Sequence, residues 1–172
     1  RAFECQLLQA PFFDPNWHFH AEYQLFIVNE GTGTRFVGDH VSPFKTGDLV
    51  LTGPDLPHLW RSDPEYFEGE SELGTEGVVV YFPADLLAGQ LLKKLEALSI
   101  KQMLMRAARG VSFGPVTSEK VRPLMTSLTG KSDFHGIIDL LNILHLLSKA
   151  EDYVLLANPD YSNSLKESDT ER

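Results

Sequence analysis

The first half of the chain is a series of short runs of β-forming residues, separated at regular intervals by glycine and proline. Short strands with this spacing are typical of an all-β sandwich or barrel. The runs cover residues 23–29, 34–37, 48–52, 58–61 and 77–82. We therefore predict that residues 1–82 form a β-barrel.

The pattern changes to helical spacing after Pro83. Apolar residues recur at helical intervals from Leu87 to Leu98, and Gly130 is placed to end a helix that Thr117 or Ser118 begins. We predict a helical region over residues 83–150 that packs on the barrel. A short run at residues 111–113 is expected to return to the barrel as a strand.

The last predicted helix, residues 134–149 with Asp133 as its cap, has more apolar residues than one buried stripe requires. The surplus predicts contact with a second subunit, and hence a homodimer. The residues expected in or near this interface are Leu140, Leu144 and Leu147. The alternative is that this is the central helix of a small helical core, for which few other helices are available.

Length and composition favour one globular domain that does not enter a membrane. The chain has 172 residues, of which 42% are hydrophobic, and no apolar run approaches the roughly 18 residues that a membrane span needs. Cys5 is the only cysteine, and no secretion signal is visible. We expect a cytoplasmic protein, and because the sequence starts with Arg1, we expect its natural N-terminus to lie upstream.

The charge distribution argues against nucleic-acid binding by this chain. Its net charge is −9, and residues 1–82 carry 4 basic and 13 acidic side chains, whereas the rest carries 11 of each. Proteins bind duplex DNA largely by neutralising its phosphates with lysine and arginine. Any DNA contact is therefore expected from another part of the protein.

One cluster of residues could carry chemistry. His18, His20, Glu22 and Gln24 enter a predicted strand, and period-2 alternation sends all four to one face. Two imidazoles on one face can close around an ion, with His58 arriving from a neighbouring strand. Gln24 could join only if the strand coils or bulges. The alternative is that the histidines only form hydrogen bonds with their neighbours.

Several segments resemble the N-terminal cupin domains of AraC-family bacterial transcription regulators. His18-x-His20, Gln24 and Gly31 are similar to the first cupin motif, and residues 47–58 to the second. The amino-acid sequences of residues 17–23, 33–39 and 47–54 are more specific to the AraC type. The similarity covers roughly residues 10–150. Gln24 departs from the motif, which has a glutamate here. This weakens any divalent metal site by one charge unless Glu22 substitutes.

The resemblance implies a cupin-type jelly-roll β-barrel followed by a C-terminal helical dimerisation region. It implies a sensor that binds a small-molecule effector or a metal in the barrel and controls a C-terminal helix-turn-helix DNA-binding domain, which we expect to be missing from this chain. Residues 151–172 are then a polar linker towards it. The expected ligand-binding residues are His18, His20, Glu22, Gln24, Arg35, His58 and Trp60. A divalent transition metal, Zn, Ni or Fe, would use His18, His20, Glu22, Gln24 and His58.

Two other functions are compatible with the sequence. A metal-dependent cupin enzyme, a dioxygenase or an isomerase, would use the same ligands with an open position for substrate. It would also need a general acid or base, and the sequence identifies none, so we expect no catalytic residues. The other possibility is a structural dimerisation module with an empty barrel. Trp17, Phe19, Trp60 and Tyr81 are expected in the barrel wall or at a ligand rim.

Overall fold

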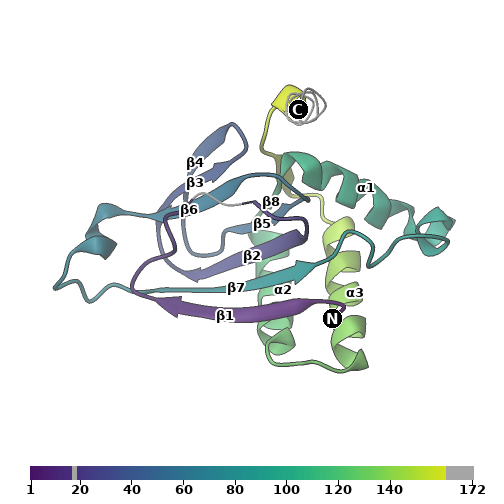
Figure 1. Cartoon of the computed structure of the whole chain (residues 1–172), viewed down its shortest axis with the longest axis horizontal. Helices are drawn as coiled ribbons and strands as arrows, with labels where there is room; N and C mark the ends of the chain where they lie inside the picture. The colour runs from purple at the N-terminus through teal and green to yellow at the C-terminus, as the bar shows by residue number, and fades with distance from the viewer. Residues whose placement is uncertain (17–18, 162–172) are drawn as a thin grey trace.

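The computed structural model describes residues 1–16 and 19–161, arranged as two β-sheets with helices on the outside of the larger one (Figure 1). The predictions for Trp17, for His18 and for the end of the linker, residues 162–172, lie outside the described residues. Within the described part, no helix is long and apolar enough to cross a membrane.

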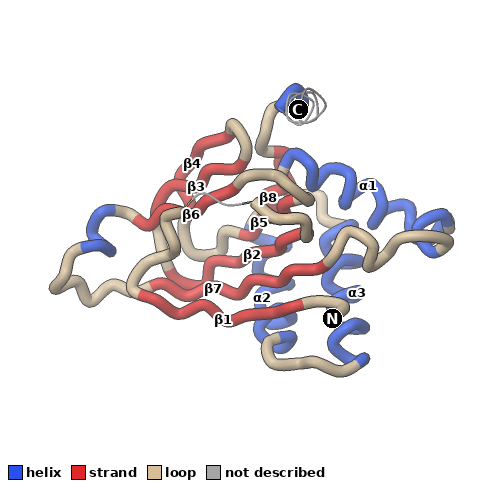
Figure 2. Tube along the Cα trace, viewed as in Figure 1, coloured by secondary structure: helices blue, strands red, loops and turns tan. Residues whose placement is uncertain are grey.

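The larger sheet has six antiparallel strands and the smaller sheet has three (Figure 2). The larger has the order β1(Glu4–Ala10), β7(Thr75–Phe82), β2(Tyr23–Glu30), β5(Leu49–Thr52), β8(Val111–Phe113) and β9(Tyr153–Leu155). The smaller has the order β4(His40–Phe44), β3(Gly33–Val37) and β6(His58–Ser62). The five runs predicted from the sequence are confirmed as β2, β3, β5, β6 and β7, whereas β1, β4 and β9 were not predicted.

Strand alternation in the larger sheet creates two separate cores. In β2, Phe26 and Val28 belong to the cluster between the sheets, with Trp60 of β6 among its members. Leu25 and Ile27 belong to the other cluster, where the sheet meets the helices. Every one of these strand residues is buried, as expected for strands covered on both faces.

Helical segments follow β7 and cover the outer face of the larger sheet. They comprise η2(Leu91–Lys93), η3(Leu95–Ala97), α1(Leu98–Arg106), η4(Ala107–Arg109), α2(Pro115–Leu128) and α3(Phe134–Ser148), and a further turn, η1(Pro64–Phe67), precedes β7. The helix predicted to begin near Leu87 is wrong in its first part. Only short 3-10 turns precede Leu98, and they leave Leu91 and Leu95 exposed.

Helix α2 begins earlier than the sequence suggested, and α3 begins where it was predicted. Gly114 caps α2 in place of Thr117 or Ser118, because Pro115 occupies the first turn. The Asp133 side chain accepts a hydrogen bond from the Gly136 backbone N–H, which confirms the predicted cap of α3.

The apolar side of α3 packs inside the chain. Leu140, Leu144 and Leu147 are fully buried, against the larger sheet and its neighbouring helices. The interpretation of these three leucines as a surplus face for a second subunit is therefore corrected. The sequence argument found few other helices to surround this one, whereas α1 and α2 pack against α3 and the outer face of the sheet completes the cluster.

The described chain ends by packing against the barrel. Strand β9 pairs with β8, and Leu156, which follows it, is buried between the sheets. Backbone hydrogen bonds join Leu156 to Gly110 and Ala157 to Arg109. The Asn158 backbone N–H donates to the Asp39 carboxylate in the β3–β4 turn. The first part of the predicted linker is thus a structural element of the barrel.

Candidate functional site

A cavity of about 240 Å³ lies between the two sheets. Its walls come from β2, β6 and β7 and from the segment that includes β1 and the turn after it. The lining residues are Leu8, Phe13, Asp14, Gln24, Phe26, Trp60, Val79 and Tyr81. Apolar and aromatic walls with a few polar groups are the usual surroundings of a small-molecule ligand.

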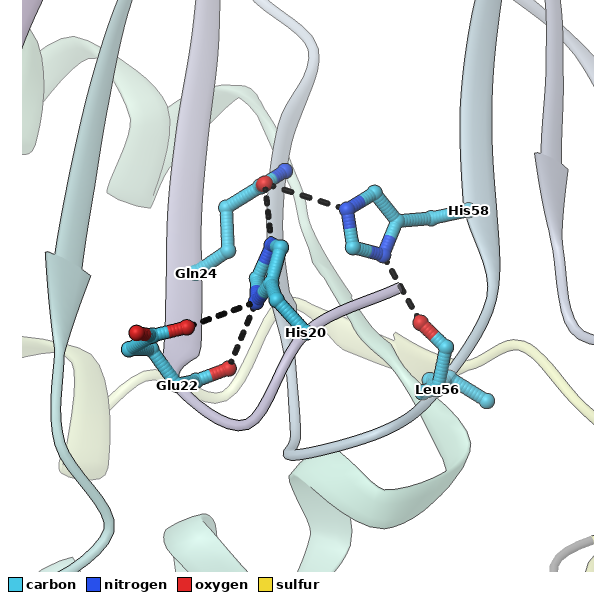
Figure 3. A network of polar contacts seen from close by, with 5 residues as sticks. All are labelled: His20, Glu22, Gln24, Leu56 and His58. Carbon is cyan, nitrogen blue, oxygen red and sulfur yellow. Dashed lines mark hydrogen bonds and ion pairs between the residues drawn. The ribbon is translucent and has the colours of Figure 1, made fainter. Parts of the chain in front are cut away.

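Gln24, which lines this cavity, lies between two histidines (Figure 3). Its Oε1 lies 3.1 Å from His20 Nε2 and 3.1 Å from His58 Nε2. Gln24 is 3% exposed and His58 is fully buried, whereas His20 reaches the surface. The structure therefore brings His20, Gln24 and His58 together, as the sequence pattern suggested.

Backbone carbonyls determine which nitrogen of each ring carries the proton. Nδ1 of His20 lies 3.1 Å from the Glu22 carbonyl, and Nδ1 of His58 lies 2.8 Å from the Leu56 carbonyl. A carbonyl only accepts, so each Nδ1 donates and each neutral ring has an acceptor lone pair at Nε2. If the Gln24 side-chain amide is turned by 180°, its NH₂ group takes the place of Oε1 and can donate a hydrogen bond to each of the two Nε2 atoms.

A loop, not a strand, places His20. Strand β2 begins at Tyr23, so the prediction that residues 18–24 alternate on one strand face is wrong for His20 and Glu22. The His20 carbonyl accepts a 2.7 Å hydrogen bond from the Asp55 backbone N–H, which ties the loop to the β5–β6 turn. His58 follows this turn as the first residue of β6, so one imidazole comes from a loop and the other from the start of a strand.

Glu22 is beside this cluster and not at its centre. Its carboxylate lies 3.5 Å from His20 Nδ1, on the opposite side of the ring from Gln24. The carboxylate therefore orients His20 from outside, and the structure does not place it where the two Nε2 atoms meet. Within the described residues, no group of three or more His, Cys, Asp and Glu side chains is arranged to hold a metal.

Tyr81 connects the histidines to the cavity. Its ring packs edge-on against His20 with centroids 5.1 Å apart. Burial raises the pKa of the Tyr81 phenol, and the negative charges of Glu4 and Glu22 raise it further. The hydroxyl therefore stays protonated at neutral pH and can donate a hydrogen bond to a ligand.

Arg35 lies apart from the cavity, behind Trp60. The indole N–H of Trp60 donates to Asp48 at 2.9 Å, and the other Asp48 oxygen forms an ion pair with Arg35. Burial raises the pKa of Asp48, although the Arg35 charge and the Trp60 hydrogen bond oppose this. Burial also lowers the pKa of Arg35, against the effect of Asp48. The structure thus lines the cavity with Trp60 but not with Arg35.

Sequence reasoning missed the cavity residues on and after β1. Leu8, Phe13 and Asp14 line the cavity, but this segment was not predicted as a strand. Its apolar pair Leu7 and Leu8 is followed by Pro11, which gives no clear alternation. No sequence signal thus assigned these residues to the site.

A family model described as the AraC-like ligand binding domain matches residues 2–111. The chain belongs to this family. The AraC-like match extends from β1 to the start of β8 and includes every cavity-lining residue, whereas α2, α3 and β9 lie beyond it. The resemblance stated from the sequence is confirmed, and so is a mainly β, cupin-type fold with helices.

Solved structures similar to this AraC-like domain include several cupins. A cupin protein from Bacteroides fragilis is 16% identical, with a TM-score of 0.41 over 52% of this chain and 73% of that one. A cupin 2 conserved barrel domain protein from Salinispora arenicola is 22% identical, with a TM-score of 0.39 over 51% and 68%. Oxalate decarboxylase from Bacillus subtilis is 20% identical, with a TM-score of 0.32 over 41% and 18%. No curated protein matched significantly.

Proposed function

We propose that the chain is the ligand-sensing and dimerisation domain of an AraC-type transcription regulator. In this proposal the cavity binds a small-molecule effector, and the occupied domain controls an attached C-terminal DNA-binding domain. Membership of the AraC-like family supports ligand sensing. The observation that carries the proposal is a cavity between the sheets whose aromatic walls meet a buried amide and two imidazoles.

The cavity favours an effector with an apolar body and uncharged polar groups at one end. Phe13, Phe26 and Trp60 supply flat apolar walls. Gln24 and Tyr81 supply neutral hydrogen-bonding groups, because the Tyr81 phenol stays protonated, and the Asp14 carboxylate in the lining disfavours an anionic effector. An effector hydroxyl or carbonyl can exchange hydrogen bonds with both groups.

Calorimetry on a panel of neutral metabolites tests the proposal. For any metabolite that binds, Tyr81→Phe should weaken binding by about tenfold, the order expected for one lost hydrogen bond. Tyr153→Phe is the matched control, because Tyr153 lies on β9, contacts Arg106 and does not line the cavity. Equal affinities for the two variants would place the ligand elsewhere.

A divalent transition metal, Zn, Ni or Fe, is a second ligand that we propose for the same wall. His20 Nε2 and His58 Nε2 would bind it with the Gln24 amide oxygen, and His18 is a further candidate outside the described residues. Both imidazoles already donate Nδ1–H to carbonyls, as metal-binding histidines commonly do. When bound, the ion would act as a Lewis acid towards an oxygen atom of the effector.

Leu140, Leu144 and Leu147 are buried inside the chain. We therefore assign the proposed dimer contact to the outward side of the helices. Leu87, Leu92, Ile100 and Leu141 line an apolar groove formed by the segment before α1, by α1 and by α3. Around it, Leu95 is 80% exposed and Ile138 is 39% exposed. A second copy of this chain would cover this apolar area.

We propose a sensor in preference to a metal-dependent enzyme. Two imidazoles and an amide form a neutral donor set, which holds a divalent cation less strongly than a set with a carboxylate. A sensor tolerates a weakly held ion, whereas a metal-dependent dioxygenase or isomerase requires it. The acidic surface and the expected cytoplasmic location fit a regulator whose DNA contacts come from its other domain.

A further inference from the structure

The last described residues of the chain lie across one end of the barrel, after β9. The Ala157 backbone N–H donates to the Arg109 carbonyl at 2.7 Å, and the Arg109 Nε–H donates to the Ala157 carbonyl at 2.9 Å. The Asn158 backbone N–H donates to the Asp39 carboxylate at 2.9 Å. We call residues 156–161 the terminal strap.

Leu156 anchors the terminal strap in the same interior that surrounds the cavity between the sheets. Its side chain is 8% exposed and belongs to the cluster that includes Phe26 and Trp60 of the cavity wall. A Cβ built on Gly110 would lie 3.6 Å from a methyl carbon of Leu156 and 3.6 Å from a methyl carbon of Leu56, so both leucines pack at this glycine. The strap and the cavity therefore share one packed interior.

His58 connects Leu56 to the polar wall of the cavity. His58 Nε2 lies 3.1 Å from Gln24 Oε1, and His58 Nδ1 lies 2.8 Å from the Leu56 carbonyl (Figure 3). The carbonyl of Pro57, between Leu56 and His58, accepts a 2.9 Å hydrogen bond from the Gly38 backbone N–H. The turn that leads to His58 is thus joined to the β3–β4 turn as well.

Gly38 is the point at which the β3–β4 turn touches the terminal strap. Its φ is +56°, and a Cβ at this position would lie 2.9 Å from Ala157 Cβ and 3.1 Å from the ring of Tyr161. Glycine is therefore required for the strap to lie this close. A continuous series of contacts runs from Gln24 in the cavity wall, through His58 and its turn, to both ends of the strap.

We propose that occupancy of the cavity controls how firmly the terminal strap is docked, an inference that rests on the function proposed above. An effector that bonds to the Gln24 amide changes the partner of His58, and its apolar body supports the interior in which Leu156 packs. The strap is then held more firmly in the occupied barrel than in the empty one. In the proposed regulator the DNA-binding domain follows the strap, so strap docking transmits occupancy to that domain.

Amide hydrogen exchange followed by NMR tests the coupling, with phenol as the probe. Phenol has an aromatic body and one uncharged hydroxyl, and a shift of the Trp60 indole N–H reports that it occupies the cavity. Saturating phenol should slow exchange of the Ala157 N–H at least fivefold, the lower end of the usual range for coupled sites. The effect should exceed that at Ile143 in the middle of α3, which reports opening of the whole domain.

A pair of variants tests the same contacts without any ligand. His58→Ala should speed exchange of the Ala157 N–H at least fivefold relative to His58→Asn. Both variants lose the imidazole ring, but the asparagine NH₂ group can take the place of Nδ1–H and keep the hydrogen bond to the Leu56 carbonyl. The comparison therefore separates this contact from the general cost of a smaller side chain.

The reverse direction is tested from the strap. Gly38→Ala should displace the strap and weaken phenol binding by the same factor by which phenol slows strap opening, because coupling between two sites is reciprocal. Gly130→Ala is the matched control. It places alanine at a similarly positive φ of +82°, but nothing lies within 4 Å of the added Cβ.

The outcomes distinguish this inference from the proposed function. If phenol shifts the Trp60 indole N–H but leaves Ala157 exchange unchanged, the coupling is wrong and the effector site stands. Equal Ala157 exchange in the two His58 variants would also overturn the coupling. If phenol does not shift the Trp60 resonance, the proposed effector site loses its support, and the ligand-free His58 pair decides the coupling by itself.

Discussion

At the scale of single residues, Gln24 determines what the inner wall of the barrel can bind. It is an uncharged group between two imidazoles, each of which has its other nitrogen fixed by a carbonyl. A glutamate here would add a negative charge and favour a tightly held cation. In the function that we propose, the amide leaves an adaptable polar wall for an effector oxygen or a weakly bound ion.

A metal-binding assay tests the two imidazoles. In a calorimetric titration with Zn²⁺ or Ni²⁺ in excess, the untagged protein should bind about one ion per chain. His20→Ala should lower the affinity at least tenfold, because it removes one of two imidazole donors. Glu22→Gln is the control and should keep nearly full affinity, because the Glu22 backbone carbonyl still orients His20. If His20→Ala retains as much metal as the wild type, the histidines only line the wall.

The sequence was a better guide to which residues form this cluster than to how the chain brings them together. The residue types around His20 and the turn before His58 were sufficient to propose that His20, Gln24 and His58 meet. Strand alternation gave the wrong reason, because β2 starts at Tyr23 and a loop turns His20 back towards Gln24. A loop path depends on tertiary hydrogen bonds such as that from Asp55 N–H. Periodicity contains no information about them.

At the scale of elements, one carboxylate ties β9 to α2. Both oxygens of Asp152 accept hydrogen bonds from Thr117, one from its hydroxyl and one from its backbone N–H. Burial alone would raise the pKa of Asp152, but these hydrogen bonds outweigh it and lower the pKa. Asp152 thus serves as a cap for α2 from outside the helix.

Asp152→Asn should destabilise the protein at neutral pH by about 1 kcal/mol, the usual cost of a lost cap. A lowered pKa means that the native state holds this proton less tightly than the unfolded state does. The stabilisation is therefore present above the unfolded pKa of about 3.9 and is lost as the pH falls through the native value. Urea unfolding should show that the free energies of unfolding of the variant and the wild type differ less at pH 3 than at pH 7. A constant difference would mean that the charge has no role.

The helices α1 and α3 present the surface that we assign to the dimer. Leu95→Asp combined with Ile138→Asp should convert the dimer to a monomer in multi-angle light scattering, because the interface would bury two unpaired carboxylates. Both side chains are exposed, so the fold should survive. A wild type that is monomeric at high concentration would contradict the assignment.

A core variant separates association from folding. Leu144 is fully buried, so Leu144→Ala should cost about 2–5 kcal/mol of stability through the cavity that it leaves. The folded fraction should still associate as the wild type does. If the variant lost association without losing stability, the dimer interface would have to include the face of α3 that carries Leu144.

The composition of α3 shows why a helix sequence alone leaves its partner undetermined. Eight apolar residues between Ile137 and Leu147 require a large apolar surface, and α1, α2 and the sheet together satisfy this requirement as well as a second subunit would. The outer faces of β2 and β7 carry Leu25, Ile27 and Val80, and each of these strands is apolar on both faces. Strands buried on both faces therefore indicate that helices cover them.

At the scale of the whole molecule, the uneven charge should keep this chain off DNA. Its acidic first half holds the cavity, and its neutral second half holds the helices. We expect no salt-sensitive, sequence-specific binding at micromolar concentration in anisotropy titrations against the upstream region of its own gene. The same titration with a DNA-binding protein and its known operator is the positive control. Specific binding by the 172-residue chain would contradict the proposal that another domain makes the DNA contacts.

The order of strands in the larger sheet affects how the chain becomes a stable protein. Strand β8 lies between β5 and β9, and Leu156 fills part of the space between the sheets. During synthesis, residues 1–110 therefore emerge with an unpaired β5 edge and an incompletely filled interior. We expect the interior to be filled only once the segment up to Ala157 has been made, and the exposed β5 edge to favour aggregation of any shorter chain.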